Sequence, residues 1–300
     1  TPFSRGGDGR SPLGPVLREY LVSEFMAAVG VPTTRALAAV ATGERVVRQM
    51  AEPGAVLTRV ASSHIRVGTF QFAAVRRDES ALKALADHVI ARHYPEAANA
   101  DDPYLALLEA VTARQAALVA RWMSLGFIHG VMNTDNCSIA GETIDYGPCA
   151  FMEQFDPQKV YSSIDQGGRY AFNNQPGIAQ WNLARFAETL LPLMREEGDA
   201  VVEQATEVLR GFTQRFSAEQ RCLHTNKLGL APESDRAAPL MDALEIQMHQ
   251  GRMDMTATFD ALTHYAKALG TDTSGQPQKD ALLALTTQPD GLAAWLADWE

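Results

Sequence analysis

Apolar residues near the start of the chain first show the spacing of a helix and then that of short strands. One group of apolar residues recurs every three or four positions: Val16, Leu17, Tyr20, Leu21, Phe25, Met26 and Val29. This spacing predicts an amphipathic helix that ends at Gly30 and Pro32. Three short runs rich in strand-forming residues follow, with TGE and EPG expected as the turns between them: 36–41, 44–49 and 55–60.

Helical periodicity dominates the rest of the chain. Two helices are predicted at 79–92 and 104–125, before a long irregular stretch at 146–176. Six more are predicted after it, at 181–195, 199–216, 217–228, 237–248, 256–269 and 279–299. A short mixed part followed by a helical part predicts an α+β fold class, divided into residues 1–78 and 79–300.

Composition narrows the classes of protein that fit. The 300 residues are 46% hydrophobic, which is enough for a substantial core, and no run approaches the roughly 20 apolar residues of a membrane helix. A net charge of -10 argues against a general nucleic-acid surface. The polar first residues predict no signal peptide, and the three cysteines lack C-x-x-C spacing. We therefore expect a cytoplasmic protein that binds neither membrane nor nucleic acid.

The stretch HGVMNTDN and the later segment IDYG carry the most chemical content. With His129 on the first position of the kinase pattern H-R-D-x-x-x-x-N, Asn136 falls on the last, and Asp145 begins a D-Y-G segment in place of D-F-G. Val131 then occupies the position of the catalytic aspartate. The pattern predicts either an inactive kinase or a different proton acceptor. We assign His129 a structural role through a buried hydrogen bond.

Asn136 and Asp145 are the candidate metal ligands. A tight hairpin around Gly141 is expected to place them side by side. Their amide and carboxylate oxygens suit Mg²⁺, which proteins hold through one or two side chains plus substrate phosphates. Asp135, the neighbour of Asn136, can accept a proton from an attacking hydroxyl. The alternative is an ordinary Asx turn at these residues, with Asp145 capping a loop.

Phosphate-binding groups are predicted upstream of that motif. Arg59 and Arg66 lie seven residues apart and can clamp phosphates if the chain between them turns, although surface salt bridges are the alternative. The GGDGR loop at 6–10 can bring backbone N–H groups to a phosphate. Glu19 and Glu24 are expected on the solvated face of the first helix.

Longer segments extend these motifs into a family resemblance. Six of them occur in this order: TPFSRGGDGR, REYLVSEFMAAVGVPTTRAL, EPGAVLTRVASSHIRVGTF, HGVMNTDNCSI, IDYGPCAFME and SSIDQGGRYAFNNQPGIAQWNLARFAE. Together they closely resemble selenoprotein O, the YdiU family of protein adenylyltransferases, from Thr1 to about Pro192. The resemblance weakens through the helical C-terminal part.

The resemblance implies a protein-kinase-like fold, with a partial small lobe at 1–78 and a mostly helical large lobe at 79–300 that carries the catalytic and metal loop at 129–147. It also implies transfer of AMP from ATP to Ser, Thr or Tyr hydroxyls of protein substrates, with Mg²⁺ or alternatively Mn²⁺. By resemblance the proton acceptor is Asp135, and the metal ligands are Asn136 and Asp145. The implied nucleotide contacts are Asp8, Gly9, Arg59, Arg66 and Asp145.

The resemblance also implies a chain truncated at both ends. In this family a glycine-rich loop and a lysine lie upstream of the T-P-x-S-R segment, and a Cys or selenocysteine motif lies at the C-terminus. The lysine pairs with a glutamate on the following helix, for which Glu19 is the better-aligned candidate and Glu24 the fallback. Two other functions stay open: a kinase-like phosphotransferase, and a non-catalytic pseudokinase that binds nucleotide or partner proteins.

Overall fold

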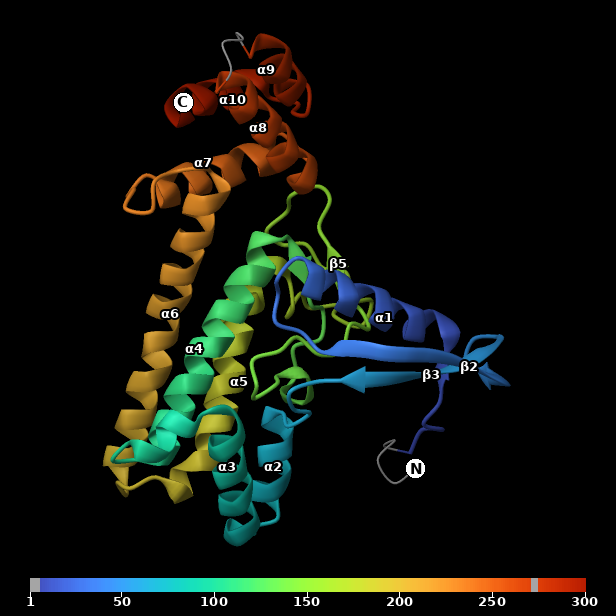
Figure 1. The fold of residues 1–300 in the computed structure, drawn as a ribbon, viewed down its shortest axis with the longest axis vertical. Helices are drawn as coiled ribbons and strands as arrows, with labels where there is room; N and C mark the ends of the chain where they lie inside the picture. Colours follow the sequence, from blue (N-terminus) through green and yellow to red (C-terminus); the bar gives the residue numbers. More distant parts are fainter. Residues whose placement is uncertain (1–5, 271–274) are drawn as a thin grey trace. The chain divides into compact units, whose positions relative to one another are not determined.

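The computed structural model describes residues 6–270 and 275–300, which form a mixed α/β structure that is mostly helical (Figure 1). Its strands are β1 (Ser11–Pro12), β2 (Arg35–Val47), β3 (Ala51–Val60), β4 (Phe127–Ile128) and β5 (Ala150–Phe151). Its α-helices are α1 (Leu13–Ala28), α2 (Val67–Val75), α3 (Glu79–His93), α4 (Pro103–Ser124), α5 (Gln175–Leu190), α6 (Asp199–Lys227), α7 (Ala237–Gln250), α8 (Met255–Leu269), α9 (Gln276–Leu283) and α10 (Pro289–Trp299). The short 3-10 helices are η1 (Pro95–Asn99), η2 (Thr134–Asn136), η3 (Phe172–Asn174) and η4 (Leu191–Leu193).

The described residues fall into two compact units, each built from three chain segments. The first contains the described residues up to 118 together with 131–148 and 179–212. The second contains 119–130, 149–178 and 213–300. Every residue proposed above for the functional site belongs to the first unit.

An antiparallel sheet of order β1-β3-β2 carries α1 along one face (Figure 1). Strands β2 and β3 are continuous, and residues 48–50 turn between them, so the prediction of three short runs with turns at TGE and EPG is wrong. TGE is instead a bulge at 42–44 opposite Gly54. A Cβ at Gly54 would lie 2.8 Å from Thr42 Oγ1, so the glycine makes room for the bulge.

Helix α1 confirms the predicted helix, but it buries a different face from the one expected. Its buried residues are Val16, Glu19, Ser23 and Met26. The apolar residues Leu17, Leu21 and Phe25 are 44%, 65% and 47% exposed. Glu19 is therefore buried, and the expectation that it is solvated is wrong.

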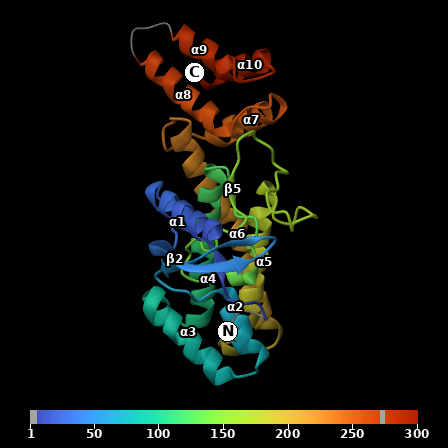
Figure 2. The ribbon, with the colours of Figure 1, turned by 90° about the vertical axis from the view of Figure 1, so that its right-hand side faces the viewer.

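Helices α2 to α5 contribute to the first unit. The bounds of α3 and α4 agree with the predictions to within one residue, but α2 was not predicted and α5 begins six residues earlier than expected. Figure 2 shows α2 and α3 side by side. Phe70 of α2 meets Phe186 of α5 edge to face, with ring centroids 4.9 Å apart. These aromatic rings lie in the core beneath α2.

The second unit has its own apolar core. Phe127 of β4 pairs with Phe151 of β5, and α7 and α10 supply buried residues such as Leu244 and Leu296.

The helices predicted at 199–216 and 217–228 are the single helix α6, and the helix predicted at 279–299 is interrupted before Pro289, which opens α10. None of the helices in the described ranges is long and apolar enough to span a membrane.

Candidate functional site

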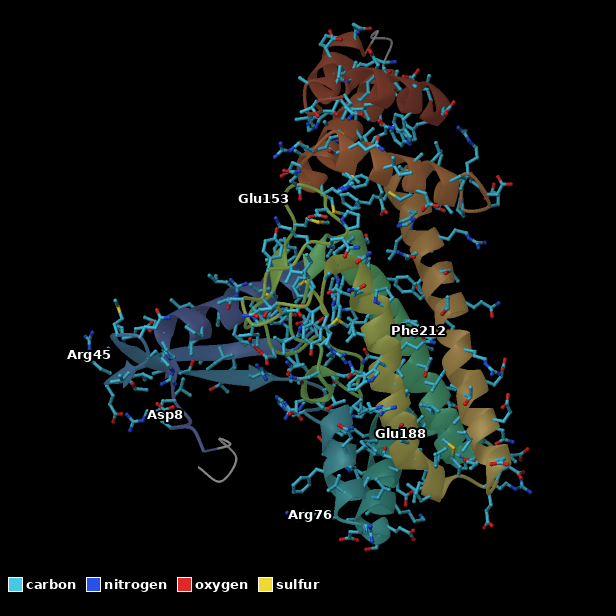
Figure 3. The ribbon with its side chains drawn as sticks, turned by 180° about the vertical axis from the view of Figure 1, so that it is seen from behind. Asp8, Arg45, Arg76, Glu153, Glu188 and Phe212 are labelled. Carbon is cyan, nitrogen blue, oxygen red and sulfur yellow. The ribbon has the colours of Figure 1, made fainter. Side chains whose placement is uncertain are left out.

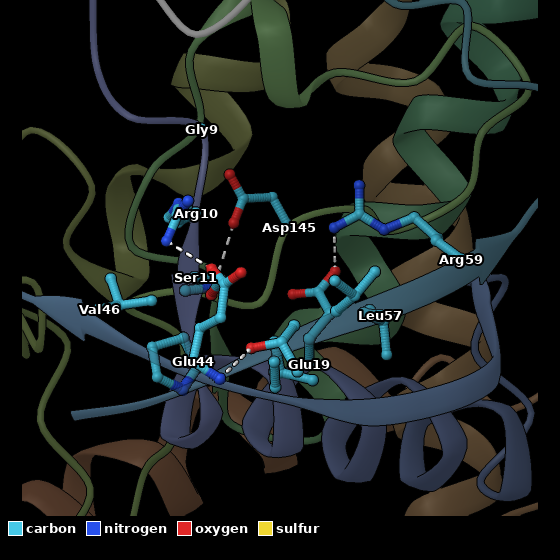
Figure 4. Close-up of a pocket in the computed structure, with 16 residues that line it drawn as sticks. Gly9, Arg10, Ser11, Glu19, Glu44, Val46, Leu57, Arg59 and Asp145 are labelled. Atoms are coloured by element: carbon cyan, nitrogen blue, oxygen red, sulfur yellow. Dashed lines mark hydrogen bonds and ion pairs between the residues drawn. The ribbon is translucent and has the colours of Figure 1, made fainter. Parts of the chain in front are cut away.

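A pocket of about 550 Å³ is formed by the segment before β1, helix α1, the sheet and the Asp145 segment (Figure 4). This volume lies within the range of small-molecule sites. Its wall combines apolar residues with carboxylates and guanidinium groups: Gly9, Arg10, Ser11, Pro15, Val16, Glu19, Thr42, Glu44, Val46, Gly54, Ala55, Val56, Leu57, Arg59, Asp145 and Gly147. Gly9, Arg59 and Asp145, all predicted from the sequence, therefore line one cavity.

Asp145 has a left-handed backbone conformation, with φ at +70°. A residue with a side chain is seldom found there, and aspartate is one of the few that tolerate it. The main chain after it turns back, so that Gly147 N–H donates to Asp145 Oδ1 at 3.2 Å. The carboxylate is half-buried at the pocket wall.

Glu19 connects two walls of the pocket. Its Oε1 pairs with the guanidinium of Arg59 on β3 (Figure 4), and its Oε2 accepts the N–H of Tyr146 at 2.7 Å. Glu24 instead binds Arg35 at 2.6 Å on the surface, and this ion pair lowers the pKa of Glu24 to about 2. Of the two glutamates, Glu19 is therefore the one at the pocket, and its cationic partner is Arg59.

The segment before β1 is tied to the β2–β3 hairpin by ion pairs. Asp8 binds Arg48 through two contacts of 2.9 and 3.1 Å and accepts the Arg10 N–H, so its pKa falls to about 2. Arg10 Nη1 lies 2.6 Å from Glu44 Oε2. Figure 3 shows Asp8 beside the hairpin that carries Arg45.

These ion pairs change the predicted set of pocket residues. Gly9 and Arg10 line the pocket, whereas Asp8 lies outside its lining and is engaged by Arg48. Arg10 and Glu44 were missed by the sequence analysis. The position of Arg10 directly after the predicted phosphate loop could have indicated it, but nothing in the sequence around Glu44 marks that residue.

Asp135 and Asn136 lie in η2, beside the start of α2. Two main-chain hydrogen bonds fix this arrangement, from Val67 N–H to Cys137 O at 2.9 Å and from Ile139 N–H to Ile65 O at 3.0 Å. A Cβ added to Gly68 would lie 2.2 Å from Asp135 Oδ1, so the carboxylate packs directly on the first turn of α2. The amino end of a helix favours negative charge at such a position.

Arg66 does not share the pocket with Arg59. It precedes α2, where its N–H donates to Thr69 Oγ1 at 3.1 Å, and it pairs with Ser138. The hairpin predicted around Gly141 is also wrong, because Ser138 pairs with Arg66 while Thr143 pairs with Thr33. The residues before and after Gly141 thus pair with two different segments of the chain. Gly141 itself lies in a turn, in which its N–H donates to Ser138 O.

The Asn136 amide and the Asp145 carboxylate each carry an oxygen of the kind that magnesium binds. Asn136 Nδ2 donates to Val131 O at 3.0 Å, which commits the amide nitrogen to the main chain, and Oδ1 is the acceptor atom of this side chain. Within residues 6–270 and 275–300, no group of three or more His, Cys, Asp or Glu side chains is placed to hold a metal. Asp145 lines the pocket, whereas Asn136 is not among its lining residues.

His129 lies in the second unit and is fully buried. Its main-chain N–H donates to Gln175 Oε1 at 2.9 Å, and its ring centroid lies 5.3 Å from that of Trp122. These contacts agree with the structural role predicted for it. Cys137 and Cys149 are buried thiols, and Cys222 is an exposed one.

Comparison with known proteins gives consistent matches over the whole chain. The family model "Protein adenylyltransferase SelO" matches residues 1–300. Proteins named "Protein nucleotidyltransferase YdiU" from Rhodopseudomonas palustris strains BisB5 and HaA2 are 66% and 60% identical over 89% and 100% of this chain. One of that name from Rhizobium leguminosarum bv. trifolii (strain WSM2304) is 56% identical over 100% of the chain. The matched regions cover 54%, 59% and 58% of these three relatives.

Proposed function

The chain belongs to the SelO protein adenylyltransferase family, and from this premise we propose that it transfers AMP from ATP to Ser, Thr or Tyr hydroxyls of protein substrates. The observation that carries the proposal is the pocket in which Gly9, Arg59 and Asp145 meet. We also propose that residues 1–78 and 79–300 correspond to the small and large lobes of a protein-kinase-like fold. The relatives are longer than this chain, so the proposal concerns the site that the chain contributes.

Two guanidinium groups of the pocket wall support the binding of a triphosphate, and three carboxylates, Glu19, Glu44 and Asp145, line the same wall. Arg59 and Arg10 place guanidinium groups at its wall, and guanidinium groups bind phosphate oxygens in pairs. Gly9 has φ at +69°, a backbone conformation that glycine adopts freely in anion-binding loops. Asn136 and Asp145 are the residues that would hold Mg²⁺, which when bound neutralises phosphate charge.

Asp135 is assigned the proton transfer. Its carboxylate takes the proton of the acceptor hydroxyl while the hydroxyl oxygen forms a bond to the α-phosphorus of ATP. The bond from that phosphorus to the bridging oxygen of the β-phosphate breaks, and pyrophosphate leaves. Arg59 stabilises the negative charge on the phosphates as this bond breaks.

Labelled ATP tests the proposal. Incubation with Mg²⁺ and a protein substrate mixture is expected to transfer label from α-labelled ATP to protein and to transfer none from γ-labelled ATP. Asp135→Asn should abolish transfer while ATP still raises the melting temperature. Asp260→Asn, at an exposed aspartate of the second unit, is the matched control and should retain the wild-type rate. Label from γ-labelled ATP alone would indicate a phosphotransferase, and binding without any transfer would indicate a pseudokinase.

A further inference from the structure

Tyr146, directly after Asp145, is fully buried, and its main-chain and side-chain polar groups all have partners. Its N–H donates to Glu19, and its carbonyl oxygen accepts from Arg18 Nε at 3.0 Å. Its hydroxyl makes a hydrogen bond with Thr33 Oγ1. The residue that follows Asp145 is therefore fixed both by α1 and by the loop between α1 and β2.

The direction of the Tyr146–Thr33 hydrogen bond follows from the other neighbours of Thr33. A threonine hydroxyl has one hydrogen to donate, and Thr33 Oγ1 lies 2.9 Å from Thr34 O and 3.4 Å from Thr143 O. Because that hydrogen goes to a carbonyl oxygen, the Tyr146 hydroxyl donates to Thr33. Both side chains are buried, so water cannot readily replace either partner.

The same loop also holds the chain before Asp145. Thr34 N–H donates to Thr143 O at 3.0 Å, and Thr143 N–H donates to Pro32 O at 2.9 Å. Residues 32–34 thus bind the chain two residues before Asp145 and one residue after it. Asp145, between these anchors, has the left-handed backbone conformation that costs free energy for a residue with a side chain.

We propose that Thr33 is a positioning residue, which acts through the Tyr146 hydroxyl to hold Asp145 in the conformation that places its carboxylate at the pocket. We call the Thr33–Tyr146 hydrogen bond the latch. The effect of the latch on magnesium binding rests on the proposed function, whereas its effect on the Asp145 backbone does not. Two independent measurements therefore test it.

The first measurement is hydrogen–deuterium exchange of the amides of residues 144–149. Tyr146→Phe and Thr33→Val each remove one partner of the latch with little change of shape. Loss of a buried hydrogen bond should speed exchange in this segment about fivefold, and Thr33→Ser, which keeps the hydroxyl, should restore the wild-type rate. The control is Tyr94→Phe, at another buried tyrosine of the first unit, whose hydroxyl donates to Ile139 O. Exchange in 144–149 that is no faster than in this control overturns the proposal.

The second measurement is a magnesium titration of the rise in melting temperature caused by ATP. The half-saturating Mg²⁺ concentration should increase about fivefold in Tyr146→Phe and Thr33→Val, while stabilisation by ATP in the presence of EDTA stays unchanged. An unshifted titration, in a protein whose wild type responds to Mg²⁺, also overturns the positioning role. If the wild type shows no Mg²⁺ response, the proposed function fails instead, and the exchange rates alone decide whether the latch holds Asp145.

Discussion

Gly68→Ala tests whether Asp135 takes the proton from the position it has in the structure. Gly68 is the second residue of α2, and its missing side chain leaves the space that the Asp135 carboxylate fills. An added Cβ would lie 2.2 Å from Asp135 Oδ1, whereas ordinary contacts begin near 3.4 Å. The carboxylate must therefore move by about 1.2 Å (3.4 minus 2.2).

This displacement should lower the rate of AMP transfer strongly and leave the stability of the fold almost unchanged. Alanine is favoured over glycine in a helix by about 1 kcal/mol, which offsets the cost of rotating one aspartate side chain. A shift of about 1 Å in a catalytic group can lower the rate roughly 100-fold, or about 2.7 kcal/mol of transition-state stabilisation. We therefore expect kcat for AMP transfer to fall about 100-fold with a melting temperature close to that of the wild type.

The assay is the initial rate of label transfer from α-labelled ATP, measured together with thermal unfolding. Gly14→Ala is the matched control, because Gly14 is also the second residue of its helix and an added Cβ would meet nothing within 4 Å. This control should keep the wild-type rate. A Gly68→Ala protein that transfers AMP as fast as the wild type would refute the placement of Asp135 as proton acceptor. Loss of activity caused by unfolding would be visible in the melting curve.

Three further substitutions test the charged side chains. Glu19→Ala should lower the free energy of unfolding by about 3 kcal/mol because it leaves the Arg59 guanidinium and a buried N–H unpaired. Chemical denaturation should show a clearly smaller loss for Glu24→Ala, whose ion pair is on the surface. Burial lowers the pKa of Lys227 to about 8, so between pH 8 and 10.5 the unfolded chain holds a proton that the folded chain has lost, and stability rises with pH. Chemical denaturation at pH 8 and at pH 10.5 should show this rise, about 3 kcal/mol, in the wild type and not in Lys227→Met.

The helices that pack through one apolar stripe could be predicted from the sequence. The bounds of α3, α4, α7 and α8 agree with the predictions to within two residues, because the spacing of apolar side chains records which face is buried. Helix α1 shows where this reasoning fails. Its buried face includes Glu19, which has a partner 40 residues away on β3, and no pattern within the helix reveals that pairing.

The errors in the sheet and in the segment 129–147 have the same physical origin. Glycines at 43 and 54 indicate turns locally, yet Gly43 lies in a bulge and Gly54 faces it from the next strand. The turn at Gly141 was predicted correctly, but its flanks pair with Arg66 and Thr33, which are distant in sequence. Local propensities identify turns, whereas the choice of strand partner depends on packing between distant segments.

The contacts of α1 explain how the pocket can be assembled from segments so far apart in sequence. Glu19 binds Arg59 on one side and the main chain after Asp145 on the other, and Arg18 adds a second bond to the same peptide unit. A displacement of α1 must therefore move the Arg59 guanidinium and the Asp145 segment, which both line the pocket, together. Glu19, on the buried face of α1, interrupts the apolar pattern of that helix, and it also connects the two walls of the pocket.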